Sequence, residues 1–122
     1  MNYTGSGMSV LVYEPDLIFS SRLERLSRSI EQDFRVFDDL AVLLNEARMA
    51  KPLAFIINLD EMKHDAIQEF VSFHVPVLGY YSHVNFETAR MALRSGVNQV
   101  VTRGAFVVRA EAVFRELLDS TR

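Results

Sequence analysis

The hydrophobic pattern of this chain changes period repeatedly, and this feature constrains the fold more than any other. Short apolar runs of strand length alternate five times with longer stretches that carry apolar residues three or four positions apart. Such strict alternation predicts right-handed strand–helix–strand crossovers and a parallel sheet with helices on both faces. The predicted strands lie at 10–12, 34–37, 54–57, 75–78 and 99–101.

The stretches between these runs read as amphipathic helices. Asp16, Asp38 or Asp39, and Asn85 are predicted to cap three of them, and Gly96 is predicted to end the fourth helix. The third helix is expected to be short. The predicted inward-facing stripes are Phe19, Leu23, Leu26 and Ile30; Leu40, Leu43, Leu44 and Ala47; Ile67, Phe70 and Val71; Phe86, Ala89 and Leu93; and Ala110, Val113, Phe114, Leu117 and Leu118.

Length and composition indicate one globular domain. The chain has 122 residues, of which 49% are hydrophobic, and its net charge is −3. That charge offers no basic stripe for nucleic acid, and the apolar runs are too short to span a membrane. The absence of cysteine excludes disulfides and fits a cytoplasmic protein. We expect a flexible leader over residues 1–8, because Gly5, Ser6 and Gly7 interrupt it, and one domain over residues 9–122.

In an open parallel sheet, the functional site lies beyond the carboxyl ends of the strands. The residues that follow the predicted strands are therefore the candidates for a site. They are Glu14, Asn58, Tyr81 with Ser82, and Arg103. The three histidines of the chain lack the spacing of metal ligands, and no glycine-rich phosphate loop is present.

Four segments together resemble the bacterial response-regulator receiver (CheY-like) family. Residues 51–59, KPLAFIINL, are similar to the segment that ends in the phosphoacceptor of a receiver. Residues 76–78, 92–97 and 100–103 resemble the start of the fourth strand, the end of the fourth helix and the fifth strand. The resemblance covers nearly the whole chain after the leader. It implies a flavodoxin-like α/β fold of three layers, with a five-stranded parallel sheet of order 2-1-3-4-5.

The resemblance also implies a phosphorylation pocket, from which this chain departs at every position. In the family, two acidic residues bind Mg²⁺, an aspartate accepts phosphate, a Thr or Ser and a Lys contact the phosphoryl group, and an aromatic residue rotates on activation. The matching positions here hold Glu14 with Pro15, Asn58, Tyr81 (Ser82 follows it), Arg103 (Gly104 follows it) and Val100.

These substitutions remove the chemistry that the family implies. The neutral amide of Asn58 does not form a stable acyl phosphate, and Glu14 alone is a poor site for Mg²⁺, so we expect weak or absent magnesium binding and no cofactor. Arg103 keeps its charge and has a planar fork suited to a carboxylate. We therefore predict an ion pair between Arg103 and Glu14. The plainer alternatives are that Glu14 is a solvated loop acid, that Arg103 lies on the surface, and that Asn58 only satisfies loop backbone.

The sequence favours a phosphorylation-independent protein–protein interaction module in bacterial signal transduction, a pseudo-receiver without enzymatic activity. A candidate interaction face, which includes Arg90, Arg94 and Gln99, comprises the fourth helix, the fifth strand and the last helix, and a homodimer through it is one expectation. One alternative is a phosphate-switched receiver that uses Asp60 as a shifted acceptor. Another is a small-ligand-binding flavodoxin-like domain with an anion near Arg103.

Overall fold

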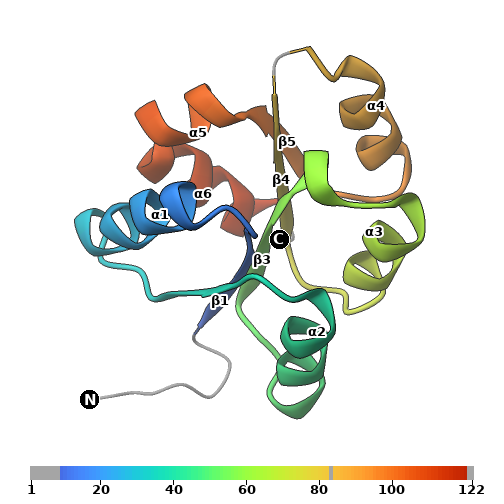
Figure 1. The fold of residues 1–122 in the computed structure, drawn as a ribbon, viewed down its shortest axis with the longest axis horizontal. Coiled ribbons are helices and arrows are strands. Elements are labelled where there is room, and N and C mark those ends of the chain that lie inside the picture. Colours follow the sequence, from blue (N-terminus) through green and yellow to red (C-terminus); the bar gives the residue numbers. More distant parts are fainter. Residues whose placement is uncertain (1–8, 83, 121–122) are drawn as a thin grey trace.

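Five parallel strands form one sheet at the centre of the molecule (Figure 1). The computed structural model describes residues 9–82 and 84–120, so the predicted leader lies outside the described residues. The strand order is β2-β1-β3-β4-β5, which confirms the predicted order and the α/β flavodoxin-like fold. The strands are β1 (Val10–Tyr13), β2 (Phe34–Phe37), β3 (Ala54–Asn58), β4 (Val77–Tyr81) and β5 (Gln99–Thr102).

Helices cover both faces of this sheet (Figure 1). One face carries α1 (Leu17–Ser29), α5 (Arg103–Val108) and α6 (Ala110–Asp119), and the other carries α2 (Leu40–Met49), α3 (His64–Val71) and α4 (Phe86–Arg94). A short 3₁₀ helix, η1 (Leu59–Glu61), follows β3 directly. None of the described helices combines the length and the apolar character that crossing a bilayer demands.

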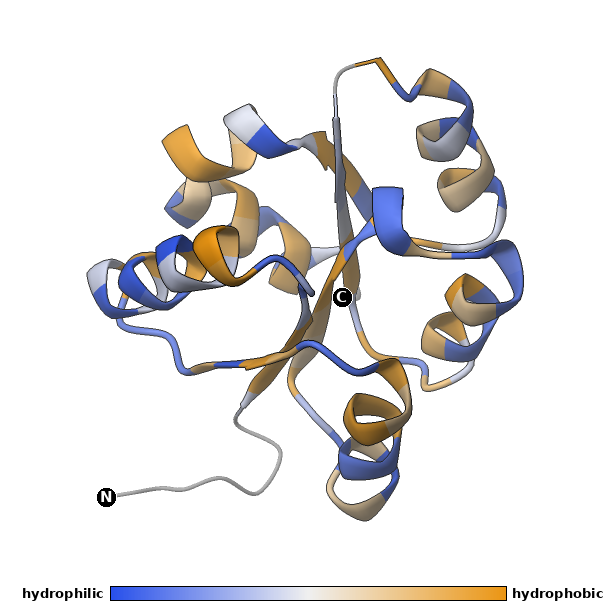
Figure 2. Cartoon of the chain, viewed as in Figure 1, coloured by the Kyte–Doolittle hydropathy of each residue, from blue (hydrophilic) through white to orange (hydrophobic). Residues whose placement is uncertain are grey.

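The central strand β3 shows why the sheet is buried on both sides. Ala54 and Ile56 belong to the core under α1, α5 and α6, whereas Phe55 and Ile57 belong to the core under α2, α3 and α4. All four side chains are fully buried. Successive side chains of a strand point to opposite faces, so a continuous apolar run is what a doubly covered strand requires. Figure 2 shows hydrophobic residues along β3, and hydrophobic and hydrophilic residues interspersed along helices such as α1 and α2.

The parallel register brings the candidate residues to one level at the carboxyl edge of the sheet. Tyr13 of β1 lies opposite Ile57 of β3, so Glu14 and Asn58 follow at the next level. In the neighbouring pair of strands, Asn58 lies opposite Tyr80. The three side chains therefore meet at the ends of β1, β3 and β4.

The predicted inward stripe of the fourth helix is wrong. Phe86 is 63% exposed and Leu93 is 54% exposed, while Ala92 is the residue of α4 that is fully buried. Ala92, with the partly buried Met91, faces the core, whereas Phe86 and Leu93 point to solvent. The fourth strand also begins and ends later than the predicted 75–78, and a separate helix, α5, precedes the predicted last helix.

Candidate functional site

The centre of the site is the buried carboxylate of Glu14, which is only 1% exposed. Its Oε1 accepts a hydrogen bond of 2.9 Å from Asn58 Nδ2 and another from the Tyr80 hydroxyl. Its Oε2 accepts a hydrogen bond of 2.9 Å from the backbone N–H of Asp16. Burying a carboxylate is costly unless donors satisfy it, and three donors do so here. Glu14 is therefore not a solvated loop acid.

Asn58 connects Glu14 to the next loop. Its side chain is 1% exposed, and its Oδ1 accepts a hydrogen bond of 2.9 Å from the backbone N–H of Asp60. The same side chain donates to Glu14 and accepts from Asp60, which a carboxylate at this position would be unable to do without a proton. The amide is thus chemically matched to its place in the network.

Tyr80 completes the cluster and is the functional residue that the sequence-based interpretation missed. The ring is fully buried between Phe106, with ring centroids 5.9 Å apart, and Phe19, with centroids 5.5 Å apart. Burial raises the pKa of the Tyr80 phenol, and its hydrogen bond to Glu14 raises the pKa further. The hydroxyl is therefore a neutral donor. The available signal was the register of two parallel strands, which places a polar tip beside Asn58.

The predicted ion pair between Arg103 and Glu14 is absent. Among the described residues, no ion pair involves Arg103, and its guanidinium carbon lies 4.6 Å from the centroid of the Phe19 ring. A planar, weakly hydrated guanidinium stacks favourably on an aromatic face. The oxygens of Glu14 already have neutral donors, so the carboxylate does not need this cation. Within the described part of the chain, the buried Nε of Arg103 has no hydrogen-bond partner.

Asp60 lies at the other end of the network and is half-buried. Its Oδ2 accepts a hydrogen bond of 2.8 Å from the backbone N–H of Ser82, and its Oδ1 accepts one of 2.6 Å from Asn85 Nδ2. Both carboxylate oxygens therefore bind the segment between β4 and α4. Each oxygen thus has one donor from this segment, and these donors hold the carboxylate in place.

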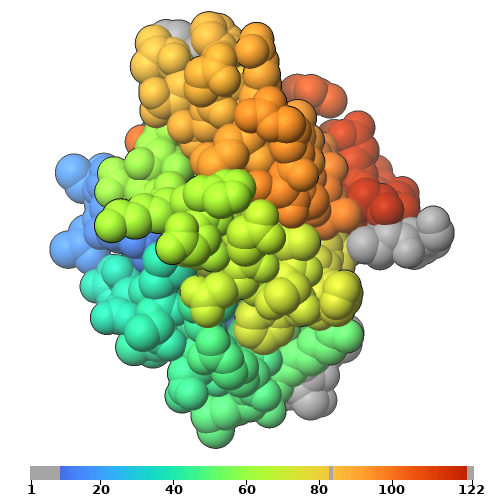
Figure 3. All heavy atoms as spheres, turned by 90° about the vertical axis from the view of Figure 1, so that its right-hand side faces the viewer, coloured from blue at the N-terminus to red at the C-terminus, as the bar shows by residue number. Residues whose placement is uncertain are grey.

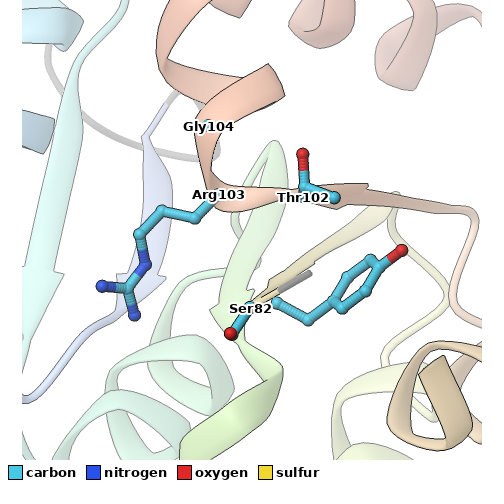
Figure 4. Close-up of a pocket in the computed structure, with 5 residues that line it drawn as sticks. Ser82, Thr102, Arg103 and Gly104 are labelled. Atoms are coloured by element: carbon cyan, nitrogen blue, oxygen red, sulfur yellow. The ribbon is translucent and has the colours of Figure 1, made fainter. Parts of the chain in front are cut away.

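A cleft of about 380 Å³ opens beside this cluster, between the ends of β4 and β5. Figure 4 shows Ser82, Thr102, Arg103 and Gly104 around it, with the side chain of Arg103 extending away from Thr102. Thr102 caps α5, because its Oγ1 accepts a hydrogen bond of 3.1 Å from Ala105 N. Tyr81 also lines the cleft, and its ring packs against the core under α2, α3 and α4.

The site does not fit a magnesium ion of the kind that receivers bind. Mg²⁺ requires several hard oxygen ligands at near-octahedral geometry. Among the residues that the structure describes, Glu14 is the one buried carboxylate, its oxygens accept from three donors, and Asn58 turns its N–H toward it. Within residues 9–82 and 84–120, no cluster of three or more His, Asp or Glu side chains is arranged to hold a metal ion.

The three residues predicted on the interaction face lie apart from this cluster. Arg90 forms an ion pair of 3.2 Å with Glu87 on the same helix. Arg94 is exposed at the end of α4. Gln99 of β5 donates a hydrogen bond of 3.0 Å to Glu116, which joins β5 to α6, while its buried Oε1 has no partner among the described residues. Figure 3 shows α4 on the surface at one end of this side of the molecule, beside α3.

Comparison of the sequence with protein-family profiles and with curated proteins gives no match. Comparison of the structure does. A response-regulator receiver protein from Pseudoalteromonas atlantica matches with a TM-score of 0.77 and 12% identity, over 93% of this chain and 99% of that one. A receiver domain from Clostridium thermocellum matches with a TM-score of 0.78 and 11% identity, over 91% and 94%. This chain has the receiver fold.

A larger protein contains the same fold as one part. NtrX from Brucella abortus matches with a TM-score of 0.82 and 18% identity, over 93% of this chain but only 27% of that one. The structural similarity establishes the receiver fold, but at identities this low it says nothing about chemistry. The chemistry of this chain therefore has to be argued from its own pocket.

Proposed function

We propose that this chain is a phosphorylation-independent, receiver-like interaction module in signal transduction, without enzymatic activity. The observation that carries the proposal is the buried cluster of Glu14, Asn58 and Tyr80. In this cluster a neutral amide occupies the position of a nucleophile, and a phenol and an amide donate to the carboxylate that would otherwise bind a metal.

Phosphoryl transfer to a side chain needs an anionic nucleophile and a cation that neutralises the phosphoryl oxygens. Asn58 provides no anion. Arg103, at the position that matches the lysine of a receiver, stacks on Phe19. Tyr80 and Asn58 saturate the Oε1 of Glu14. Each of these contacts is internal to the chain, which supports a pocket that stays in one state.

The exposed apolar residues of α4 support a role in binding. Val84 and Phe86 at the start of α4 are 67% and 63% exposed, and Leu93 lies two turns further along the helix. Phe86 and Leu93 are seven residues apart and so share a helical face. Large apolar residues gathered on one exposed helical face are a feature of interaction surfaces. A receiver domain of similar fold, from a Saccharomyces cerevisiae response regulator, was co-crystallised with a histidine phosphotransfer protein.

A second copy of this chain is our first candidate for the partner. Glu87 lies in the first turn of α4 and Arg94 lies in its last turn. When two such helices pack antiparallel about a two-fold axis, each acid faces the arginine of the other copy, and the apolar residues lie between them. A different signalling protein that binds the same face is the other possibility that the experiment addresses.

Two measurements test the proposal. Incubation with acetyl phosphate and Mg²⁺, followed by intact mass spectrometry, is expected to show no added phosphoryl group. Sedimentation at increasing concentration is expected to show reversible dimers that Phe86→Glu weakens, whereas the control Met49→Glu, at a residue 76% exposed on α2, leaves them unchanged. Readily formed phosphoprotein would overturn phosphorylation independence. A strict monomer would leave a different protein as the partner.

The same assay distinguishes the alternative in which Asp60 accepts phosphate. A mass increase that Asp60→Asn abolishes would establish that alternative. The cleft beside Arg103 and Ser82 is the observation that favours the other alternative, the binding of a small ligand. In a thermal-shift screen with inorganic phosphate and nucleotides, a raised melting temperature would support that alternative, and an unchanged one would count against it.

A further inference from the structure

We infer that Asp60 is a positioning residue that fixes the start of α4, and with it the apolar face of that helix. The sequence had suggested a different role for Asp60, that of a shifted phosphate acceptor. The inference rests on the proposed function, because it concerns the orientation of the proposed binding face. Asp60, Ser82 and Asn85 are called the Asp60 bridge below.

The first step is the geometry of the bridge. Asp60 lies in η1, directly after the buried strand β3, so a rigid element holds its backbone. Its two carboxylate oxygens accept from two different residues of the β4–α4 segment, Ser82 N at 2.8 Å and Asn85 Nδ2 at 2.6 Å. Charge-assisted hydrogen bonds of this length are stronger than neutral ones. One side chain therefore ties two points of the segment to the sheet.

The second step concerns Asn85, which occupies the N-cap position of α4. An asparagine at this position normally accepts a hydrogen bond from the first turn of its helix. Here the side chain makes no such bond, and its Nδ2 donates to Asp60 instead. The predicted cap is thus replaced by a tertiary contact. The backbone of Asn85 still connects to the helix, because its carbonyl accepts a hydrogen bond from Ala89 N.

The third step is continuity with the buried cluster. The N–H of Asp60 donates to Asn58, and Asn58 donates to Glu14. One series of hydrogen bonds therefore runs from the β1–α1 loop, through the β3–α3 segment, to the start of α4. A hydrogen-bonded network of this kind holds its members in one arrangement. The face of α4 is fixed by groups that the chain itself carries.

The test uses the graded loss of acceptors at position 60. Asp60→Asn keeps one acceptor oxygen and Asp60→Ala keeps none, while Ser82→Ala leaves the Ser82 N–H in place and serves as the matched control. We expect the protection of the residue-82 amide, its exchange relative to the intrinsic rate, to fall roughly tenfold or more in Asp60→Ala, to fall less in Asp60→Asn, and to stay at the wild-type level in Ser82→Ala. Amide chemical shifts of Phe86 and Leu93 are expected to change in the same order.

If Asp60→Ala does not fold, Asn85→Ala removes one bond of the bridge and is expected to shift the same α4 amides. Unchanged Ser82 exchange in folded Asp60→Ala, or unchanged Phe86 and Leu93 shifts in folded Asp60→Ala or Asn85→Ala, would overturn the inference. Neither readout requires a partner, so this failure is distinct from a failure of the proposed binding function, which Phe86→Glu tests.

Discussion

The side-chain amide of Asn58 donates a hydrogen bond of 2.9 Å to the carboxylate of Glu14, and both side chains are only 1% exposed. The position that matches a phosphoacceptor is therefore a donor to an acid. Replacing this donor with an acceptor is therefore expected to lower the stability of the fold, because the buried carboxylate of Glu14 has no water to replace the lost donor.

The variant Asn58→Asp places a second carboxyl group against Glu14. We expect a loss of about 1–3 kcal/mol in the free energy of unfolding at pH 7, because two close buried carboxylates do not both ionise. Repulsion raises the pKa of the introduced group in the folded state, so the lost stability is recovered as pH falls through that pKa toward the unfolded value of about 3.9, and a smaller loss is already expected at pH 5 than at pH 7. Urea unfolding at both pH values measures this. Asn45→Asp, on the exposed surface of α2, is the control.

The same variant also tests whether one substitution restores phosphorylation. We expect no efficient phosphorylation of Asn58→Asp by acetyl phosphate with Mg²⁺, since Tyr80 still donates to Glu14 and Arg103 still stacks on Phe19. Intact mass spectrometry provides the measurement. Rapid and complete phosphorylation would show that the pocket retains the activity that we consider lost.

The hydroxyl of Tyr80 is expected to contribute to the stability of the fold in addition to the packing of its ring. Tyr80→Phe keeps the stacking on Phe106 but removes one donor from the buried Glu14, and we expect it to cost about 1–3 kcal/mol in urea unfolding. Tyr81→Phe, one residue later on the same strand, is expected to change stability by less than about 0.5 kcal/mol. Equal costs for the two variants would contradict the role of the Tyr80–Glu14 hydrogen bond.

Alkaline pH should reveal the same phenol. Burial raises the pKa of Tyr80 above its ordinary value of 10.0, so the folded state keeps a proton that the unfolded state releases. The stability that this proton provides is fully present below pH 10 and is lost as pH rises beyond it, by about 1.4 kcal/mol per pH unit for one group. Urea unfolding between pH 9 and about 11 is expected to show a shallower loss for Tyr80→Phe than for the wild type.

The architecture could be predicted from the sequence because the residues of a buried strand show by themselves whether it is covered on one face or both. The run from Ala54 to Ile57 is apolar at every position, and only a strand covered on both faces requires that. Asp16 is also predicted correctly, since its side chain accepts from Ile18 N and Phe19 N at the start of α1. These features depend on neighbours in sequence.

The errors concern features that depend on distant residues. Whether Phe86 and Leu93 point inward or outward depends on how closely α4 approaches β4 and β5, which helical spacing does not reveal. The partner of Arg103 was predicted from charge alone, but neutral donors from the same loop and from β3 and β4 already satisfy Glu14. The role of Tyr80 required the register between β3 and β4.

The two phenylalanines Phe86 and Phe106 should differ sharply on truncation. Phe106 is fully buried and stacks on Tyr80, so Phe106→Ala is expected to cost about 3–5 kcal/mol or to prevent folding. Phe86 is 63% exposed, so Phe86→Ala is expected to change stability by less than about 0.5 kcal/mol. A large cost for Phe86→Ala would mean that α4 turns this face to the core, as helical spacing alone had indicated.

The glycines Gly79 and Gly104 provide a matched pair for the packing of β4 against η1. A Cβ at Gly79 would lie 2.7 Å from Leu59 Cδ1, and Leu59 is buried, so the side chain has no free space to enter. We expect Gly79→Ala to cost about 1–3 kcal/mol through this overlap. A Cβ at Gly104 meets nothing within 4 Å, and Gly104→Ala is expected to stabilise α5 by up to about 1 kcal/mol.

Because the overlap at position 79 involves Leu59, the double variant Gly79→Ala with Leu59→Ala should cost less than the sum of the two single variants in urea unfolding. Strict additivity would mean that Leu59 is not what excludes a side chain at position 79.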